Sequence, residues 1–252
     1  MRILITNDDG MHAAQILPLI RWCQKLGEVT VFVPRVEQSG KSHGSSVRDP
    51  FEVKQVELAP NVTIWAVDST PADCVRFAVL GMKMKFDLVI SGINKGLNIS
   101  SDIMYSGTVG AAGEAVHLGI PAVAISTTGQ NYPAATEKLD EILAYFKENN
   151  LFSKHTFYNV NIPANAKGIR ITHQGGPFGI DHFEPIGNDM WEPKGNRIWE
   201  DSNNDFLDTD AVMHGYISIS PLTIERTDWT VFNELIKHEK RQNLDSGFDG
   251  IM

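Results

Sequence analysis

Two adjacent carboxylates, Asp8 and Asp9, stand near the start of the sequence, directly after a short apolar run. Carboxylates a few ångströms apart repel each other by about 1 kcal/mol in water and by several times that near a protein surface, so a bound cation would relieve the repulsion. Oxygen ligands suit Mg²⁺, Mn²⁺ or Ca²⁺ rather than zinc. Asn, Asp and Gly are also favoured in turns, so residues 7–10 alone fit an ordinary turn equally well.

A second set of polar side chains lies in a Ser- and Gly-rich loop after the second apolar run. Ser39 could add a neutral oxygen ligand to a cation, and Lys41 or His43 could face a phosphate. Residues 40–42 (GKS) imitate the end of a Walker A loop, but Arg35 stands where that motif requires glycine, which excludes an NTP-binding P-loop. A hydrophilic surface loop without a function explains the same residues.

Asn94 follows a further apolar run and has a glycine two residues away on each side, so the backbone can turn closely around it. At the carboxyl end of a parallel strand, its side-chain oxygen would lie at the same edge of the sheet as Asp8 and could be another cation ligand. An Asn that hydrogen-bonds its own turn is the alternative interpretation.

Ser106, Gly107 and Thr108 open a predicted helix of small residues. Free main-chain amides at a helix amino terminus, with hydroxyls beside them, form an anion site that needs no basic side chain. Such a site could bind the phosphate of a substrate. The glycines that follow have GxxGxxG spacing rather than the GxGxxG of dinucleotide folds, so NAD binding is not indicated. Ser106 or Thr108 could also be an ordinary helix cap, and the two roles are compatible.

The elements that must position these residues alternate between strands and helices over the first 150 residues. Continuous apolar runs predict buried parallel strands, and apolar residues at helical spacing predict the helices between them. The pattern predicts an α/β fold with a Rossmann-like, doubly wound, mostly parallel sheet, whose ligands bind at the carboxyl ends of the strands. The predicted strands are 2–6, 29–33, 51–57, 62–67, 87–91 and 121–126, and the predicted helices are 12–25, one from Pro71, 108–118 and 134–147.

The last hundred residues are less regular. They contain predicted strands at 156–162, 168–173 and 215–220, a polar, loop-like region at 176–209 and a closing helix at 229–241. We therefore expect a catalytic core over residues 1–150 and a smaller, β-rich carboxyl-terminal extension over residues 151–252. One integrated domain is compatible with the same pattern.

The composition restricts the partners and the compartment. The 252 residues include 22 basic and 31 acidic side chains, which give a formal net charge of -9. Because this charge repels polyanions, no nucleic-acid polymer is expected as a partner, and the phosphate of a substrate must be bound by local groups. No apolar stretch approaches the roughly 20 residues that span a bilayer, and the amino terminus does not read as a secretory signal. Cys23 and Cys74 form no CxxC pair. These features predict a cytoplasmic protein without a membrane partner.

Two other polar residues are weaker candidates. His117, on the predicted helix of small residues, is interpreted as structural. Asp68 is interpreted as a residue that organises the turn into Pro71, and a functional carboxylate is the alternative. No GxSxG nucleophile elbow is present.

Five segments together resemble the SurE (survival protein E) family of 5′/3′-nucleotidases. They are ITNDDG, PRVEQSGKSH, STPADCV, SGINKGLN and YSGTVGAAGEA, and the resemblance covers residues 1–128 densely and continues through 159–163 and 208–222. The resemblance implies a Rossmann-like domain and a smaller carboxyl-terminal part that exchanges arms in a homodimer, sometimes within a homotetramer.

The resemblance also implies the roles of the site residues. It makes Asp8, Asp9, Ser39 and Asn94 the ligands of one divalent cation per subunit, Mg²⁺ or Mn²⁺, with Asp8, Asp9 and Asn94 as the catalytic residues. It places the segment from Ser106 through Gly107 to Thr108 near the substrate phosphate. The expected activity is metal-dependent hydrolysis of nucleoside 5′-monophosphates, and of 3′-monophosphates as a further substrate class, to nucleoside and phosphate.

The sequence departs from the family pattern in two places. Ala14-Gln15 stand where the family usually has Pro-Gly, a change we expect to affect only the start of the following helix. The stretch after Asp210 is shorter than the common pattern, which leaves the exchanged arm and the oligomeric state open.

Two other functions share parts of this pattern. A phosphatase of the haloacid dehalogenase type, with an aspartyl nucleophile, needs two aspartates separated by one residue, whereas Asp8 and Asp9 are adjacent. A signalling receiver domain also binds Mg²⁺ with an acidic pair after its first strand, and Asp68 would then accept the phosphoryl group. Such a domain is about half as long as this chain, and the glycine-rich helix start has no role in it.

Overall fold

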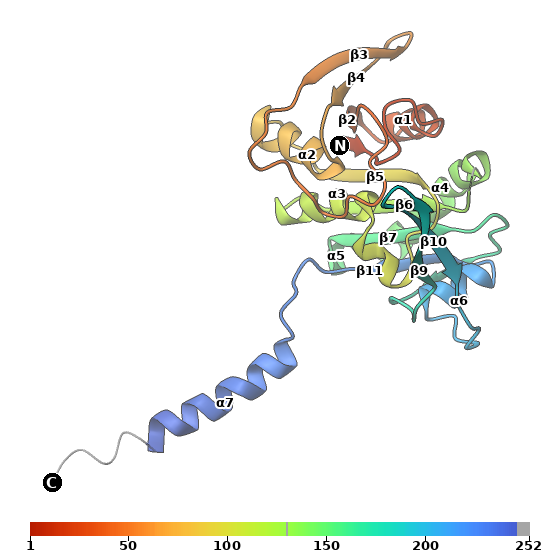
Figure 1. Ribbon diagram of the computed structural model, residues 1–252. Helices are drawn as coiled ribbons and strands as arrows, with labels where there is room; N and C mark the ends of the chain where they lie inside the picture. The colour runs from red at the N-terminus through yellow and green to blue at the C-terminus, as the bar shows by residue number, and fades with distance from the viewer. Residues whose placement is uncertain (130, 246–252) are drawn as a thin grey trace. The chain divides into compact units, whose positions relative to one another are not determined.

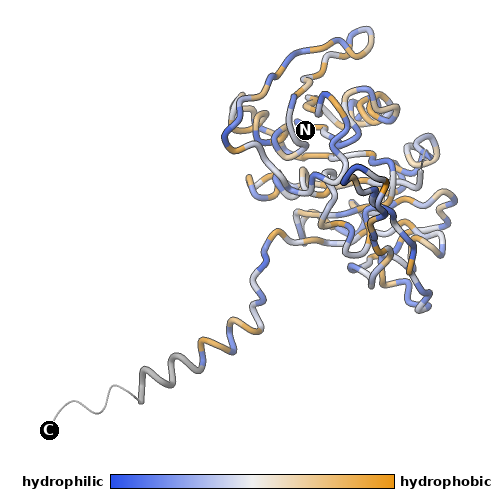
Figure 2. The backbone as a smooth tube through the Cα atoms, in the orientation of Figure 1, coloured by the Kyte–Doolittle hydropathy of each residue, from blue (hydrophilic) through white to orange (hydrophobic). Residues whose placement is uncertain are grey.

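The computed structural model describes residues 1–129 and 131–245 of the chain (Figure 1). Met1–Leu222 form one compact unit that contains every predicted site residue. A second unit begins at Thr223 and contains helix α7 (Trp229–Asp245), the predicted closing helix. Trp229, Phe232 and Leu235 of α7 are exposed, and hydrophobic residues recur along its first turns (Figure 2).

Within the described residues, nine strands form one sheet in which most neighbours are parallel, which confirms the predicted α/β class. The antiparallel pairs are β3 with β4 and β7 with β11. In spatial order the strands are β3 (Val53–Ala59), β4 (Val62–Val67), β2 (Glu28–Pro34), β1 (Arg2–Thr6), β5 (Leu88–Lys95), β6 (Ala122–Thr127), β7 (Phe157–Ile162), β11 (Ile217–Pro221) and β8 (Ile169–Ile171).

Helices cover both faces of this sheet. Alternating side chains of β1 divide between two apolar clusters: Ile3 and Ile5 pack with α1 and α4, whereas Leu4 packs with α2 and α3. The first face carries α1 (Ile16–Gln24), α4 (Tyr132–Glu148) and α5 (Leu151–Lys154), and the second carries α2 (Pro71–Arg76) and α3 (Gly107–His117). The residues between Gly10 and α1 do not continue that helix, so the predicted start at residue 12 is wrong by four residues.

The predicted loop at 176–209 is also wrong. It contains an antiparallel hairpin of β9 (Gly179–Gly187) and β10 (Met190–Arg197), followed by α6 (Asp208–Met213). Almost every residue of the two strands is exposed, and each strand contains a proline, so the sequence lacks the alternation that marks a half-buried strand.

Apart from the β9–β10 hairpin, which is a separate two-stranded sheet, the carboxyl-terminal strands of the first unit belong to the main sheet. Strands β7, β11 and β8 all come after residue 150, yet they continue the sheet that begins in the amino-terminal half. The division of roles between residues 1–150 and 151–252 therefore stays a prediction. None of the helices in the described part of the chain is long and apolar enough to cross a bilayer.

The sheet order identifies the place where a ligand is expected. From β1 the chain moves to β2 on one side, and after β4 it returns to β5 on the other side of β1. The carboxyl ends of β1 and β5 thus border the point where the winding direction reverses, which is where open α/β sheets bind their ligands.

Candidate functional site

Asp8 follows the carboxyl end of β1, and its side chain contacts the amino-terminal turn of α3. The residue is buried, and its Oδ1 accepts a hydrogen bond from Oγ1 of Thr108, the second residue of that helix. The main-chain oxygen of Asp8 accepts from Gln38 N at 2.7 Å, which ties the loop after β1 to the loop after β2. Segments a hundred residues apart in the sequence therefore meet at this carboxylate.

Gly107 is the residue that lets α3 approach so closely. A Cβ atom at this position would lie 2.9 Å from Asp8 Cβ and 3.0 Å from Asp8 Oδ2, which is closer than real Cβ contacts allow. Ser106 is the N-cap of α3, because its side chain accepts from Val109 N at 3.0 Å. The cap role that the sequence left open for Ser106 is confirmed, and the Thr108 hydroxyl holds Asp8.

Asp9 is oriented differently from Asp8. Its Oδ2 accepts from Lys95 N at 3.1 Å, at the end of β5, and also from Gln15 Nε2. Gln15 is buried and Asp9 is half-buried, so this contact is partly shielded from solvent. Ala14-Gln15, which depart from the family pattern, were expected to affect only the start of the following helix. This expectation is wrong, because the Gln15 side chain donates a hydrogen bond to Asp9, a predicted cation ligand.

Asn94 lies within β5 rather than in a loop after it. The strand bulges at Gly92, where φ is +135° and a Cβ atom would lie 2.2 Å from Ile125 O, and then resumes with Asn94 paired to Ser126. The predicted end at residue 91 is wrong for this reason. Asn94 Nδ2 donates to Gly96 O at 2.9 Å, the local bond that the alternative interpretation anticipated. Because Nδ2 makes that bond, the side-chain oxygen is the atom that could serve as a ligand.

Ser39 is exposed on the loop after β2, and its hydroxyl donates to Glu37 Oε1 at 2.8 Å. Donation of the hydroxyl proton leaves the oxygen lone pairs available to a cation. The next turn of the loop is fixed against the start of α3, since Ser42 N donates to Tyr105 O at 2.9 Å. The loop is therefore held beside the Asp8 region, although the Ser39 side chain itself bonds only to Glu37 among the described residues.

Three further polar residues that the sequence offered, Lys41, His43 and Asp68, form no side-chain hydrogen bond with the acidic pair among the described residues. His43 Nε2 lies 2.6 Å from Glu114 Oε2 on α3, and Lys41 is exposed. Asp68 accepts from Arg35 Nη2 at 2.7 Å on the surface. The turn into α2 is instead capped by Thr70, which accepts from Asp73 N at 3.1 Å, so the interpretation that Asp68 organises this turn is wrong.

The electrostatics at the two carboxylates suit a cation. Burial raises the pKa of Asp8, and hydrogen bonds from the Thr108 side chain and main chain oppose this effect. The pKa of Asp9 is raised to about 6, chiefly by burial and next by the adjacent Asp8 carboxylate. Each carboxylate has one oxygen engaged by donors and a second oxygen free of those bonds. A divalent ion between the free oxygens would compensate the two desolvated charges.

The remaining ligands of such an ion would be neutral. Within residues 1–129 and 131–245, no three His, Cys, Asp or Glu side chains gather closely enough to share a metal ion. The two carboxylates therefore need oxygens of another type to complete a coordination shell. Ser39 offers a hydroxyl from the loop after β2, and Asn94 offers an amide oxygen from the end of β5. Oxygen-only sets of this kind fit Mg²⁺ or Mn²⁺.

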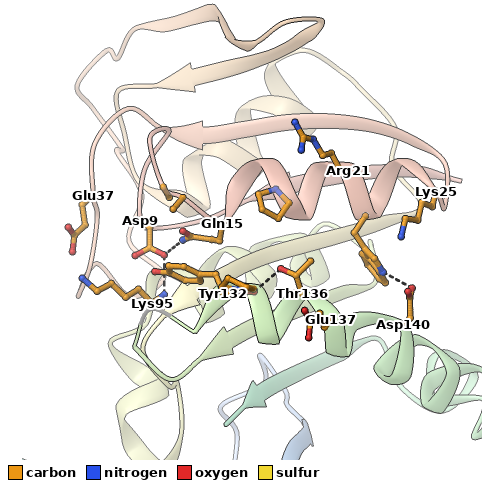
Figure 3. A pocket seen from close by; sticks show the side chains of 15 residues that line it. Asp9, Gln15, Arg21, Lys25, Glu37, Lys95, Tyr132, Thr136, Glu137 and Asp140 are labelled. Carbon is orange, nitrogen blue, oxygen red and sulfur yellow. Dashed lines mark hydrogen bonds between the residues drawn. The ribbon is translucent and has the colours of Figure 1, made fainter. Parts of the chain in front are cut away.

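An open groove begins at Asp9 and runs between α1 and α4 (Figure 3). Its volume is about 970 Å³. Tyr132, at the start of α4, reaches toward Asp9, and burial raises the pKa of its phenol to about 12, with the charges of Asp9 and Glu37 adding to the shift. Tyr132 therefore stays protonated as a hydrogen-bond donor at this end of the groove.

The comparison with known protein families agrees with this arrangement. The family model described as "Survival protein SurE" matches residues 3–178, which include both carboxylates, both neutral ligand candidates and the start of α3. The chain belongs to the SurE family.

Two curated relatives illustrate the similarity to other SurE proteins. The chain is 36% identical to the 5′-nucleotidase SurE of Thermosipho melanesiensis over 238 residues, covering 90% of this chain and 93% of the relative. It is 35% identical to the 5′-nucleotidase SurE of Legionella pneumophila strain Philadelphia 1 over 249 residues, covering 93% and 96%. The similarity thus extends over nearly the full length of each SurE protein.

The fold is similar to that of a SurE protein of known structure as well. The crystal structure of the SurE protein from Aquifex aeolicus matches with a TM-score of 0.75 and 31% sequence identity, over 95% of this chain and all of that one. The carboxyl-terminal residues beyond the family model are therefore part of a shared SurE architecture.

Three residues near the SurE site were not among the predicted site residues. Gln15 and the main chain of Lys95 hold Asp9, and Glu37 accepts from Ser39. Glu37 directly precedes the QSG segment, and its proximity to the serine was the one available signal. The contacts of Gln15 and Lys95 depend on tertiary structure and have no signature in the local sequence.

Proposed function

We propose that this chain is a metal-dependent 5′-nucleotidase that hydrolyses nucleoside 5′-monophosphates, and nucleoside 3′-monophosphates as a second class, to nucleoside and phosphate. The observation that carries the proposal is the meeting of Asp8, at the end of β1, with the amino terminus of α3 in a chain about 36% identical to proteins named 5′-nucleotidase SurE. A cation site and an anion site adjoin each other there.

Asp8, Asp9, Ser39 and Asn94 are the proposed ligands of one divalent cation per subunit, Mg²⁺ or Mn²⁺. A cation bound there supplies Lewis-acid polarisation of the phosphoryl group. Thr108 holds one oxygen of Asp8, and the donors on Asp9 hold one of its oxygens, so each carboxylate keeps a fixed orientation toward the ligand. Preorganised ligands lose little conformational entropy when the ion binds.

The start of α3 is the proposed phosphate site. Ser106 accepts from Val109 N and so fixes the first turn, and the main-chain N–H group of Gly107 is among the first four of the helix, which lack intrahelical partners. The main-chain N–H group of Thr108 also lacks an intrahelical partner, but it interacts with Asp8. The Gly107 N–H group, with the positive end of the helix dipole, binds phosphate and stabilises the negative charge that spreads over its equatorial oxygens during transfer. No basic side chain is required, which suits an acidic protein.

The two competing functions have less support. Asp8 contacts α3 and Asp9 contacts Gln15 and β5, so the adjacent aspartates do not present the paired geometry of an aspartyl-nucleophile phosphatase. Asp68 is engaged by Arg35 on the surface and is not in contact with the acidic pair among the described hydrogen bonds, which argues against a receiver domain.

We also propose a cytoplasmic homodimer or homotetramer in which residues 151–252 supply the exchanged arm. The exposed apolar side chains of the β9–β10 hairpin support this: Phe183 and Trp191 are 63% and 60% exposed. Exposed aromatic residues gathered on one hairpin are typical of an interface. Light scattering after size exclusion tests the assembly, and a monomer at micromolar concentration would contradict it.

Phosphate release tests the activity. The full-length protein should release phosphate from nucleoside 5′-monophosphates when Mn²⁺ or Mg²⁺ is present, and excess chelator should abolish turnover until the metal is restored. Full activity in excess chelator would refute a metal-dependent mechanism. Absence of phosphate release from every nucleoside monophosphate with either metal would refute the nucleotidase.

A further inference from the structure

The groove between α1 and α4 has no role in the chemistry described above. We propose that it binds the nucleoside of the substrate, with the base against Tyr132, and so determines which phosphate esters the enzyme prefers. This inference rests on the proposed nucleotidase function, because it assigns the part of the substrate that the cation and α3 do not bind.

The position of the groove is the first argument. It begins at Asp9, a proposed cation ligand, and at Lys95, whose main chain donates to Asp9, and it extends away from them along both helices (Figure 3). The far end is bounded by a hydrogen bond between the helices, from Trp22 Nε1 to Asp140 Oδ1 at 2.8 Å. A phosphate held at α3 would leave the rest of the ester at the sheet edge, where this groove opens.

The size and the lining favour a nucleoside over a polyphosphate chain. A volume of about 970 Å³ is at the upper end of the range of small-molecule sites, about 300–1,000 Å³, so a base and a ribose fit with room for water. The lining contains three basic and four acidic side chains. Because the charges nearly cancel and the acidic side chains are in slight excess, the groove suits an uncharged nucleoside and would repel a polyphosphate chain.

The side chains near Asp9 provide the contacts that a base and a ribose need. Tyr132 presents an aromatic ring on which a base can stack, and Pro18 and Pro133 supply further apolar surface. Thr136 is half-buried in the groove one turn farther along α4, and its Oγ1 donates to Tyr132 O at 2.8 Å. A bulky side chain at Thr136 would therefore fill the space beside Tyr132.

Binding of free adenosine to the full-length protein tests the groove without relying on turnover. Calorimetry should detect adenosine binding to the wild type, with at least about tenfold weaker binding in Thr136→Trp and in Tyr132→Ala, since the stacking of a base on an aromatic ring is commonly worth a factor of this size. Ala144→Trp is the matched control, because Ala144 is exposed on α4 outside the groove. Wild-type affinity in both groove variants, or no adenosine binding to the wild type, would overturn the inference.

A second measurement separates this inference from the nucleotidase proposal. In the wild type, kcat/KM for adenosine 5′-monophosphate should exceed that for ribose 5-phosphate, which lacks the base, and this ratio should fall about tenfold in each groove variant but not in Ala144→Trp. Turnover of both esters with an unchanged ratio would reject the groove and retain the nucleotidase. Adenosine binding without turnover of either ester would reject the nucleotidase and retain the groove as a nucleoside site.

Discussion

The side-chain amide of Gln15 and the main-chain amide of Lys95 donate to the same atom, Oδ2 of Asp9. This arrangement fixes the rotation of the carboxylate and leaves Oδ1 as the oxygen free for a cation. The resemblance implies glycine at this position in the family pattern, whereas this chain holds a predicted metal ligand with the side chain of Gln15.

Replacing Gln15 by alanine should weaken Mn²⁺ binding about tenfold, because partners that orient a metal ligand typically contribute a factor of 10 to 100 to affinity. Calorimetric titration of the full-length protein with Mn²⁺ measures the change directly. Gln24 is exposed at the end of α1, the helix that Gln15 precedes, and the control variant Gln24→Ala should bind Mn²⁺ like the wild type. Equal affinity in the two variants would show that Gln15 does not position Asp9.

Asp8→Asn should lower kcat/KM for a nucleoside 5′-monophosphate by more than about 100-fold, since it removes a ligand rather than a supporting partner. The melting temperature without metal should stay the same or rise, because the variant removes a desolvated charge beside Asp9 and its amide oxygen can still accept from Thr108. Phosphate release and thermal unfolding should be measured on the same preparation. An unfolded variant would indicate a structural role for Asp8.

Gly107→Ala should displace Asp8, because the added methyl would meet Asp8 Cβ at 2.9 Å. Overpacking of this kind typically costs about 1–3 kcal/mol, so the variant should fold with reduced stability while Mn²⁺ binding falls about tenfold or more. In Gly176→Ala the new methyl meets no atom within 4 Å, and this control should bind Mn²⁺ normally. Normal Mn²⁺ binding by Gly107→Ala would contradict the close approach of α3 to the carboxylate.

His214 should make stability depend on pH. Its Nδ1 lies 2.6 Å from Asp205 and its Nε2 lies 3.0 Å from Asp201, and these hydrogen bonds raise the pKa of His214 above its usual value of 6.5. The stabilisation is therefore complete below the unfolded pKa and is lost as the pH rises through the folded value. In His214→Gln, the loss of unfolding free energy should be larger at about pH 6 than at about pH 9. The same loss at both pH values would show that the charge of His214 does not stabilise the fold.

The sequence predicted the buried parallel strands well, for a physical reason. A strand buried on both faces, such as β1 with Ile3, Leu4 and Ile5, must be apolar throughout, and its polar residues can begin only where it ends. The carboxyl ends of such strands therefore carry the residues that reach the ligand crevice, as Asp8 and Asp9 do. The buried strands and the position of the two aspartates after β1 could be predicted from this pattern, whereas the cation site itself stays a prediction.

The features that were missed depend on contacts between distant segments. Strands β9 and β10 are exposed on both faces, so no burial pattern marks them. The continuation of β5 to Lys95 depends on the bulge at Gly92 against Ile125 O, which the local sequence does not specify. The bond from Gln15 to Asp9 requires the loop before α1 to fold back on β1, and sequence spacing does not predict such a return.

Anomalous diffraction from crystals of the full-length protein grown with Mn²⁺ would test the central claim most directly. The account predicts one Mn²⁺ ion per subunit with oxygens of Asp8, Asp9, Ser39 and Asn94 at about 2.0–2.6 Å, the range typical of hard divalent cations. An ion bound elsewhere, or Ser39 and Asn94 directed away from an ion that the aspartates hold, would contradict it.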